Sequence, residues 1–349
     1  MIKTLNELKI GSQFPPFIVA ELSGNHEQSL SKAMELLEAA KNAGVSALKL
    51  QTYTADTLTI KSDKPDFRIS DSFDQWKGQT LYDLYNLAYT PWEWHEPIFK
   101  RCKELDLPVF STPFDSTAVD FLESFDMPMY KIASFESNDM QLLKKVAQTK
   151  KPVIISTGLS NVSELYDSVK TLKDGGCSEL VLLKCTSAYP ANPAGSNLLT
   201  LPHMKELFGC EVGISDHTLG IGASVASIAL GGIMIEKHIK LSAKQNSVDS
   251  LFSLTPSEMK LLVESSNSAW QSLGKVFYGI SDDEKESVKF RRSLYVTKDI
   301  KRGEYFSEAN VRSIRPGYGL PPKYLEQILG KTSSCDIEAG TAVRWSHLS

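Results

Sequence analysis

The sequence predicts an α/β protein, a closed (β/α)8 TIM barrel followed by a small β-rich domain. Two observations lead to this fold class. Eight apolar runs rich in β-branched residues alternate with amphipathic stretches, and the character of the chain changes near residue 282. Strands that alternate regularly with helices form a parallel sheet, and eight such units over roughly 280 residues are expected to close into a barrel.

Each predicted strand is a short apolar run bounded by turn residues. In chain order the strands are FIVAEL (17–22), ALKLQTY (47–53), PVFSTPF (108–114), MYKIAS (129–134), PVIISTG (152–158), LVLLKCTS (180–187), EVGISDH (211–217) and MIEKHIK (234–240). Every run carries polar residues at or near its C-terminal end. In barrels of this kind the C-terminal strand ends and the loops after them carry the active site.

The stretches between the strands show helical start and stop signals. SLSKAMELLEAAKNAG is expected to stop at Gly44, because glycine readily takes the left-handed conformation that ends a helix. TPWEWHEPIFKRCKEL is expected to open with a capping box from Thr90 to Glu93, with proline at the first helical position. TPSEMKLLVESSNSAWQSLG repeats this arrangement with Thr255 and Glu258.

The predicted barrel occupies residues 1–281, and residues 282–349 form a linker and a small domain. The segment SDDEKESVKFRRS is charged and poorly periodic, whereas short β-like runs such as SLYVTKDI follow it among frequent Gly and Pro. The β-rich part starts at about residue 286. A domain of ~65 residues buries little core, so we expect it to dock on the barrel or on a second subunit.

Composition excludes several classes of protein. No run approaches ~18 apolar residues, which excludes a spanning helix, and the first residues do not resemble a signal peptide. Five scattered cysteines without CxxC spacing argue against disulfides or structural zinc, so a reducing cytoplasm is expected. The net charge of -4 gives no reason to expect a nucleic-acid or membrane partner. An anionic ligand must therefore meet locally placed cations.

Two lysines and several hydroxyl residues at the strand ends form a candidate anion site. Lys49 and Lys131 join Thr112, Ser134, Ser156 and Ser215. Together they make a cup of cations and hydroxyls that suits phosphate and carboxylate oxygens. Either lysine taken alone is more often a salt-bridged structural residue. A ligand site explains the whole set better, because unpaired charges inside a barrel are costly.

His217 and His238 lie at the ends of consecutive strands, which are neighbours in a closed barrel. Their imidazoles could meet at one divalent metal and leave open positions for water and substrate. The alternative is a pair of hydrogen-bonded surface histidines. Glu21, Glu136 and Asp249 are the carboxylates best placed to orient water or move a proton. Their alternative role is simple pairing with nearby lysines.

At these residues the sequence resembles the sialic acid synthase family, over nearly the whole chain. The matching segments are AELSGNH (20–26), ALKLQTYTADTLT (47–59), STPFD (111–115), YKIASFE (130–136), STG (156–158), KCTSAYP (184–190), GISDHT (213–218), EKHI (236–239) and RRSLYVTKDIKRGE, followed by RP at 315–316. The resemblance implies a phosphoenolpyruvate-binding barrel followed by a small antifreeze-like (SAF, β-clip) domain.

The resemblance also implies roles for individual residues. Lys49, Thr112, Lys131, Ser134, Ser156 and Ser215 would hold phosphoenolpyruvate, His217 and His238 would bind manganese or magnesium, and Asn25, His26, Gln51, Ser187, Tyr189 and Arg315 would contact the sugar. Glu21, Glu136 and Asp249 would lie at the reacting centre. Arg315 would reach a partner's site in a domain-swapped homodimer. Ser187 replaces an Asn of many neuraminate synthases, and Ser23 and Gly24 also differ, so sugar contacts there cannot simply be carried over.

The expected activity is a metal-dependent condensation of phosphoenolpyruvate with an amino-sugar aldehyde, which gives a nine-carbon sugar acid and phosphate. One rival is the condensation of phosphoenolpyruvate with a sugar phosphate, as in 3-deoxy-octulosonate or 3-deoxy-heptulosonate phosphate synthesis. That enzyme needs a second phosphate site and lacks such a C-terminal domain. A rival of another class is a carbohydrate-binding or ice-binding protein, suggested by the antifreeze-like domain alone.

Overall fold

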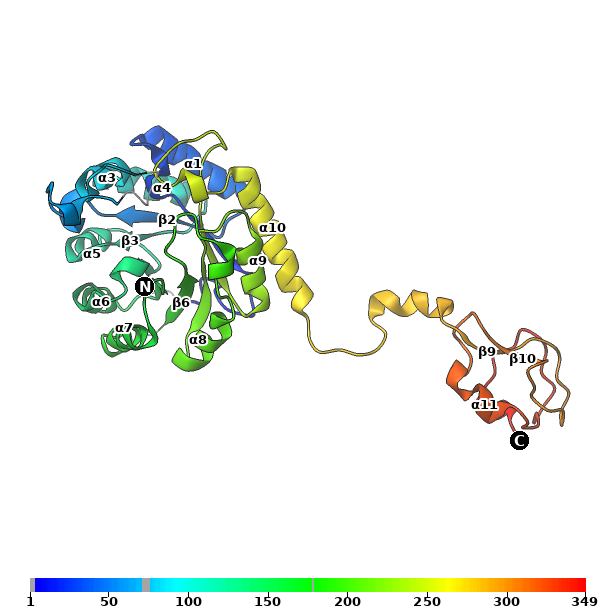
Figure 1. The fold of residues 1–349 in the computed structure, drawn as a ribbon. Coiled ribbons are helices and arrows are strands. Elements are labelled where there is room, and N and C mark those ends of the chain that lie inside the picture. The colour runs from blue at the N-terminus through cyan, green and yellow to red at the C-terminus, as the bar shows by residue number, and fades with distance from the viewer. Residues whose placement is uncertain (1–3, 71–75, 178) are drawn as a thin grey trace. The chain divides into compact units, whose positions relative to one another are not determined.

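The computed structural model describes residues 4–70, 76–177 and 179–349. The chain divides into two compact units, Met1–Gly274 and Lys275–Ser349. Figure 1 shows both, and each is described here by itself. Within the described residues, no helix is both long enough and apolar enough to span a bilayer.

Unit 1 is a closed barrel of eight parallel strands, which confirms the predicted fold. The strands are β1 (Phe17–Glu21), β2 (Ala47–Thr52), β3 (Val109–Pro113), β4 (Tyr130–Ile132), β5 (Val153–Ser156), β6 (Leu180–Cys185), β7 (Glu211–Ser215) and β8 (Met234–His238). Strand β8 closes the barrel by pairing with β1, with Glu21 opposite His238. Each strand lies within its predicted run and ends one or two residues earlier.

Helices surround the barrel (Figure 1). They are α1 (Leu30–Ala43), α2 (Ala55–Leu58), α3 (Leu81–Ala88), α4 (His95–Glu104), α5 (Ser116–Leu122), α6 (Met140–Ala147), α7 (Val162–Asp174), α8 (Thr200–Phe208), α9 (Gly222–Ala229) and α10 (Pro256–Leu273). The predicted stop at Gly44 and the predicted capping box of Thr255 and Glu258 are confirmed. Burial of the strands on both faces explains their continuous apolar runs.

The capping box predicted from Thr90 to Glu93 is wrong. A short 3-10 turn, Trp92–Trp94, precedes α4, and no side-chain hydrogen bond caps either of them. The Thr90 hydroxyl instead lies 3.3 Å from Nε2 of the buried His26. A long-range contact with the β1 loop thus replaces the local cap.

Unit 2 has its own small core and a two-stranded antiparallel sheet. Strand β9 (Ser293–Val296) pairs with β10 (Val311–Ile314), and the short helix α11 (Leu325–Ile328) follows. Leu294, Phe306 and Val343 are among its buried residues. The charged segment predicted as a linker forms the exposed 3-10 helix Asp282–Phe290.

Candidate active site

Four charged side chains meet inside the barrel near the C-terminal ends of the strands. Lys49 on β2 forms an ion pair with Glu21 on β1, and Lys49 Nζ lies 3.8 Å from the Glu236 carboxylate on β8. Lys131 Nζ on β4 lies 3.5 Å from the other oxygen of that carboxylate. Since β4 and β8 stand on opposite sides of the barrel, these side chains can meet only across its interior. None of the four is more than 5% exposed.

Hydroxyl groups surround these charges. Thr112 Oγ1 accepts a hydrogen bond from Lys49 Nζ at 3.0 Å, and Ser215 Oγ donates to Glu236 at 3.1 Å. The Ser156 hydroxyl is buried, and no hydrogen bond within the described part of the chain satisfies it. Buried polar atoms are nearly always paired, so an unpaired one at the end of β5 indicates space for a ligand.

The end of β5 approaches the site closely because residue 158 is glycine. Gly158 donates its backbone N–H to Ser134 Oγ at 3.1 Å. A Cβ at this position would lie 2.7 Å from Ser134 Oγ and closer still to the hydroxyl of Ser187. The position therefore requires glycine if both hydroxyls are to stay where they are.

Burial and neighbouring charges separate the two interior carboxylates. Burial raises the pKa of Glu21 to about 7, although Lys49 opposes this shift. Burial also acts to raise the pKa of Glu236, but Lys131 and Lys49 outweigh it and hold that pKa below its usual value. Glu236 is thus a fixed negative charge, whereas Glu21 can take up a proton near neutral pH.

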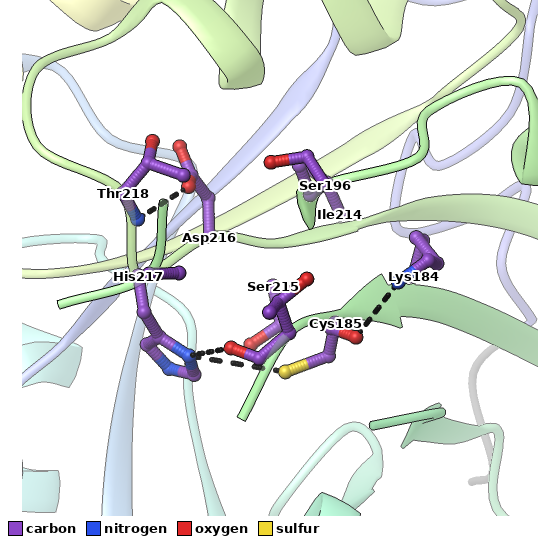
Figure 2. Close-up of a pocket in the computed structure, with 10 residues that line it drawn as sticks. Lys184, Cys185, Ser196, Ile214, Ser215, Asp216, His217 and Thr218 are labelled. Carbon is purple, nitrogen blue, oxygen red and sulfur yellow. Dashed lines mark hydrogen bonds between the residues drawn. The ribbon is translucent and has the colours of Figure 1, made fainter. Parts of the chain in front are cut away.

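The two histidines lie side by side, as predicted from consecutive strands. Their ring centroids are 5.4 Å apart, and Phe252 packs edge-on against both rings. His217 Nδ1 lies 3.2 Å from the Thr186 carbonyl and 3.8 Å from Cys185 Sγ (Figure 2). His238 Nδ1 lies 3.1 Å from Ser23 Oγ. Each Nδ1 atom therefore has a partner that fixes its ring.

This arrangement fits a divalent metal held through the Nε2 atoms. An imidazole that bonds a carbonyl or hydroxyl through Nδ1 is oriented in the way metal-binding histidines usually are. Burial holds the pKa of His238 well below its ordinary value, so this ring is a neutral potential ligand at pH 7. Among the described residues no group of three or more His, Cys, Asp or Glu side chains could hold a metal. Water or substrate would have to supply the other ligands.

The remaining predicted acids have different surroundings. Asp249 Oδ2 accepts the Gly24 backbone N–H at 3.2 Å. Burial raises the pKa of Asp249 in spite of this bond and of the nearby Ser23. Glu136 lies in the turn after β4, and its Oε2 is buried without a hydrogen bond in the described part of the chain. Burial raises the pKa of Glu136 to about 7, against the pull of Lys131.

The predicted sugar-contacting residues divide into two groups. Asn25 and His26 are fully buried, and their side chains bond to the chain itself: Asn25 to Ile239, Ser247 and Ser253, and His26 to Gln28. Gln51, Ser187 and Tyr189 are partly exposed, and the Tyr189 ring lies 4.6 Å from that of His217. Arg315 is an exposed residue of unit 2. Sugar contact by these six residues stays a prediction.

The structure adds Glu236 and Cys185, which were not among the predicted site residues. A signal for Glu236 was present in the sequence. Side chains alternate along a strand, so Glu236 shares a face with His238, while Lys237 points the other way. Lys237 indeed pairs with Asp216 outside this site, at 2.8 Å. A similar signal was present for Cys185. It lies two residues before the predicted site residue Ser187, so the same alternation places both on one face.

Fold and site together define a class, the (β/α)8 barrels with buried lysines, carboxylates and hydroxyl groups near the C-terminal ends of the strands. Within that class the chain belongs to the NeuB family, whose profile matches residues 36–278. A second profile, that of the SAF domain, matches residues 291–349. These two matches cover both units of the chain.

Similar proteins are known from several bacteria. Pseudaminic acid synthase of Campylobacter jejuni (strain 81-176) is 45% identical over 95% of this chain and 96% of its own length. N,N'-diacetyllegionaminic acid synthase of Legionella pneumophila is 35% identical over 97% of this chain and 96% of its own length. The crystal structure of the N-acetylneuraminic acid synthetase of Leptospira borgpetersenii in complex with citrate has a TM-score of 0.71. It is 27% identical and covers 83% of this chain and 96% of its own.

Proposed function

We propose that this protein condenses phosphoenolpyruvate with an N-acetylated amino-sugar aldehyde and water to give a nonulosonic acid and phosphate. The observation that carries the proposal is the meeting of Lys49 and Lys131 at Glu236, in a barrel that also holds two adjacent imidazoles and the unpaired hydroxyl of Ser156. Two buried ammonium groups with hydroxyls around them suit the phosphate and carboxylate of an enol phosphate. In phosphoenolpyruvate both groups are attached to the same carbon atom.

In the proposed reaction, the methylene carbon of phosphoenolpyruvate forms a bond to the aldehyde carbon. Water adds to the resulting cationic carbon, and the bond from this carbon to the phosphate oxygen then breaks. This carbon becomes a ketone, and of the two protons of the water one ends on the former aldehyde oxygen and the other on the phosphate. Lys49, Lys131 and the surrounding hydroxyls hold phosphoenolpyruvate in place, and they stabilise the negative charge of the departing phosphate. A manganese or magnesium ion on His217 and His238 would supply Lewis acidity to the aldehyde oxygen.

Glu136 is the carboxylate that best suits the activation of water. Glu21 forms an ion pair with Lys49, and Asp249 accepts the Gly24 N–H. Glu21 and Glu136 both have buried oxygens without a hydrogen bond in the described residues, but Glu136 is not held by an ion pair there. Its raised pKa of about 7 makes it a competent base near neutral pH. Glu136 would orient the water and take its proton.

Glu136→Gln is expected to have opposite effects on activity and stability. As a base, Glu136 must be ionised, so kcat should fall as the pH drops below about 7 in the parent protein, and the variant should be weakly active at every pH. The raised pKa means that stability from this group is lost as the pH rises from 4.5 to about 7. At pH 8 the variant should therefore be more stable to unfolding, by on the order of 2 kcal/mol.

Denaturant unfolding and pH–rate profiles of Glu136→Gln check this expectation. Glu206→Gln, an exposed change on α8, serves as the control. It should alter neither the free energy of unfolding nor the pH dependence of kcat. If Glu136→Gln stays active and its kcat still falls below about pH 7 as in the parent, another carboxylate is the base.

The sugar is proposed to be 2,4-diacetamido-2,4,6-trideoxy-L-altrose, which makes the product pseudaminic acid. The segments ELSGNH, QTYTADTLT, TPWEWH and SFESND resemble those of pseudaminic acid synthases more than those of ordinary neuraminate synthases. The higher identity to the C. jejuni enzyme than to the legionaminic acid synthase supports this choice. Legionaminate and N-acetylneuraminate synthesis are the alternatives.

Phosphate release from phosphoenolpyruvate tests the proposal and the choice of sugar together. The altrose derivative, the legionaminate precursor and N-acetylmannosamine are each supplied with manganese. We expect release with the altrose derivative at a kcat/KM at least ~10-fold above the others. With oxygen-18 in the bridging position, the label should appear in phosphate. Release with none of the sugars would favour a carbohydrate-binding protein, and label retained in the sugar would contradict the proposed bond cleavage.

We further propose a domain-swapped homodimer in which Arg315 of unit 2 contributes to a partner's sugar site. The small size of unit 2 and its exposed arginine support the idea. The test is to mix an inactive Lys131→Met chain with an Arg315→Ala chain and to measure phosphate release. If Arg315 acts across the dimer, a mixed dimer has one complete site and regains activity, whereas neither chain alone does.

A further inference from the structure

A second buried ion pair lies on the outer side of β7 and β8, away from the four interior charges. Lys237 Nζ lies 2.8 Å from Asp216 Oδ2, and both side chains are almost completely buried. Asp216 Oδ2 also accepts the Ser224 hydroxyl of α9 at 2.5 Å. These groups therefore join both strands to the helix that covers them.

Each member of this pair is the sequence neighbour of a candidate metal ligand. Asp216 precedes His217, and Lys237 precedes His238. Side chains alternate along extended chain, so the pair points outward where the histidines point inward. Figure 2 shows Asp216 and His217 on opposite sides of the backbone.

The backbone ladder does not extend as far as His217. The residue pairs between β7 and β8 end at Ser215 and Glu236, and one further hydrogen bond joins Asp216 N to the Glu236 carbonyl at 3.0 Å. His217 lies beyond the last residue of β7. Some other contact must therefore fix its backbone relative to His238, which is still within β8.

The ion pair supplies such contacts on both sides of His217. Asp216 Oδ1 accepts the Thr218 N–H at 2.8 Å, and Lys237 Nζ donates to the Thr218 carbonyl at 2.6 Å. The His217 carbonyl also accepts the Ala191 N–H at 3.0 Å. Asp216 and Thr218, the residues on either side of His217, thus both contact the ammonium group of Lys237. Lys237 is in turn the residue before His238.

We infer that Asp216 and Lys237 are positioning residues, which fix the distance between His217 and His238 for binding one divalent ion. The inference rests on the proposed metal role of the two histidines. Removing contacts that orient metal ligands typically weakens metal binding by ~10–100-fold. A pair that only stabilised the barrel would leave the metal affinity of the folded protein unchanged.

The barrel contains a matched control on its other side. Thr52 Oγ1 lies 2.6 Å from Ser111 Oγ and 2.7 Å from His95 Nε2, in a fully buried polar cluster behind β2 and β3. This cluster also joins two strands to a covering helix, but its residues are not sequence neighbours of His217 or His238. Thr52→Val should reduce stability without changing metal affinity.

The test is calorimetric titration of the metal-free full-length protein with Mn²⁺, with thermal unfolding recorded for every variant. The main variant is Asp216→Leu combined with Lys237→Met, which leaves no lone buried charge. Ser224→Ala is a milder change that removes one hydrogen bond from Asp216. We expect the Kd for Mn²⁺ to rise at least ~10-fold in the double variant and about 3-fold in Ser224→Ala.

His217→Ala separates failure of this inference from failure of the proposed function. If His217→Ala binds Mn²⁺ as tightly as the parent, the proposed metal site is wrong. If His217→Ala loses binding but the folded double variant keeps the parent's Kd, the positioning role is wrong. Should the double variant not fold, Ser224→Ala decides, and a Kd equal to that of Thr52→Val overturns the inference.

Discussion

Lys131→Met is expected to lower kcat/KM for phosphoenolpyruvate at least ~100-fold, about 2.7 kcal/mol of transition-state stabilisation. Lys131 is buried at the centre of the barrel, and its nearest carboxylate, on Glu236, lies 3.5 Å away. Methionine keeps most of the side-chain volume but removes the charge that would face the phosphate. Initial rates of phosphate release at varied phosphoenolpyruvate concentration measure the loss.

Lys151→Met is the matched control for this substitution. Lys151 precedes β5 at the opposite end of the barrel and pairs with Glu123 at 2.7 Å. Its removal should change kcat/KM less than ~2-fold, because partly exposed ion pairs contribute little. The Lys131→Met protein must be folded and as stable as the control for the comparison. If its kcat/KM for phosphoenolpyruvate then stays within ~10-fold of the parent's, the phosphate does not bind beside Lys131.

His217→Ala is expected to reduce kcat at least ~100-fold, and added manganese should not restore it. The variant removes one of the two imidazoles whose Nδ1 atoms are fixed and whose Nε2 atoms suit a metal. Loss of Lewis acidity would leave the aldehyde less electrophilic. Turnover of metal-stripped protein, titrated with manganese, is the measurement.

His203→Ala, an exposed change on α8, controls for histidine substitution and chelation. It should regain full activity when manganese is returned. Full activity of chelated His217→Ala without added metal would show that catalysis does not use a metal at this position.

The sequence predicted the barrel and the gathering of the candidate site residues at its strand ends, because both depend on local patterns. Buried parallel strands are short apolar runs, and polar residues at their ends are visible in the chain. The ends of strands β7 and β8 suggested that His217 and His238 are neighbours, and their rings lie 5.4 Å apart. In a (β/α)8 barrel consecutive strands are neighbours, so this proximity follows from strand order alone.

What the sequence did not predict depends on contacts between distant segments. Thr90 meets His26 rather than capping the following helix, because tertiary contact overrides a local preference. Glu236 lies between two lysines from β2 and β4, and only the closed barrel brings these strands to β8. The partners of Asn25 likewise come from the loop after β8.

The charges of Lys49, Lys131, Glu21 and Glu236 sum to zero when Glu21 is ionised, since two ammonium groups face two carboxylates. An incoming polyanion upsets that neutrality, and Glu21 and Glu136, each with a pKa of about 7, are able to take up a proton in response. Substrate association should therefore draw hydrogen ions from the medium. In calorimetry near neutral pH, the apparent heat of association would vary with the ionisation enthalpy of the buffer.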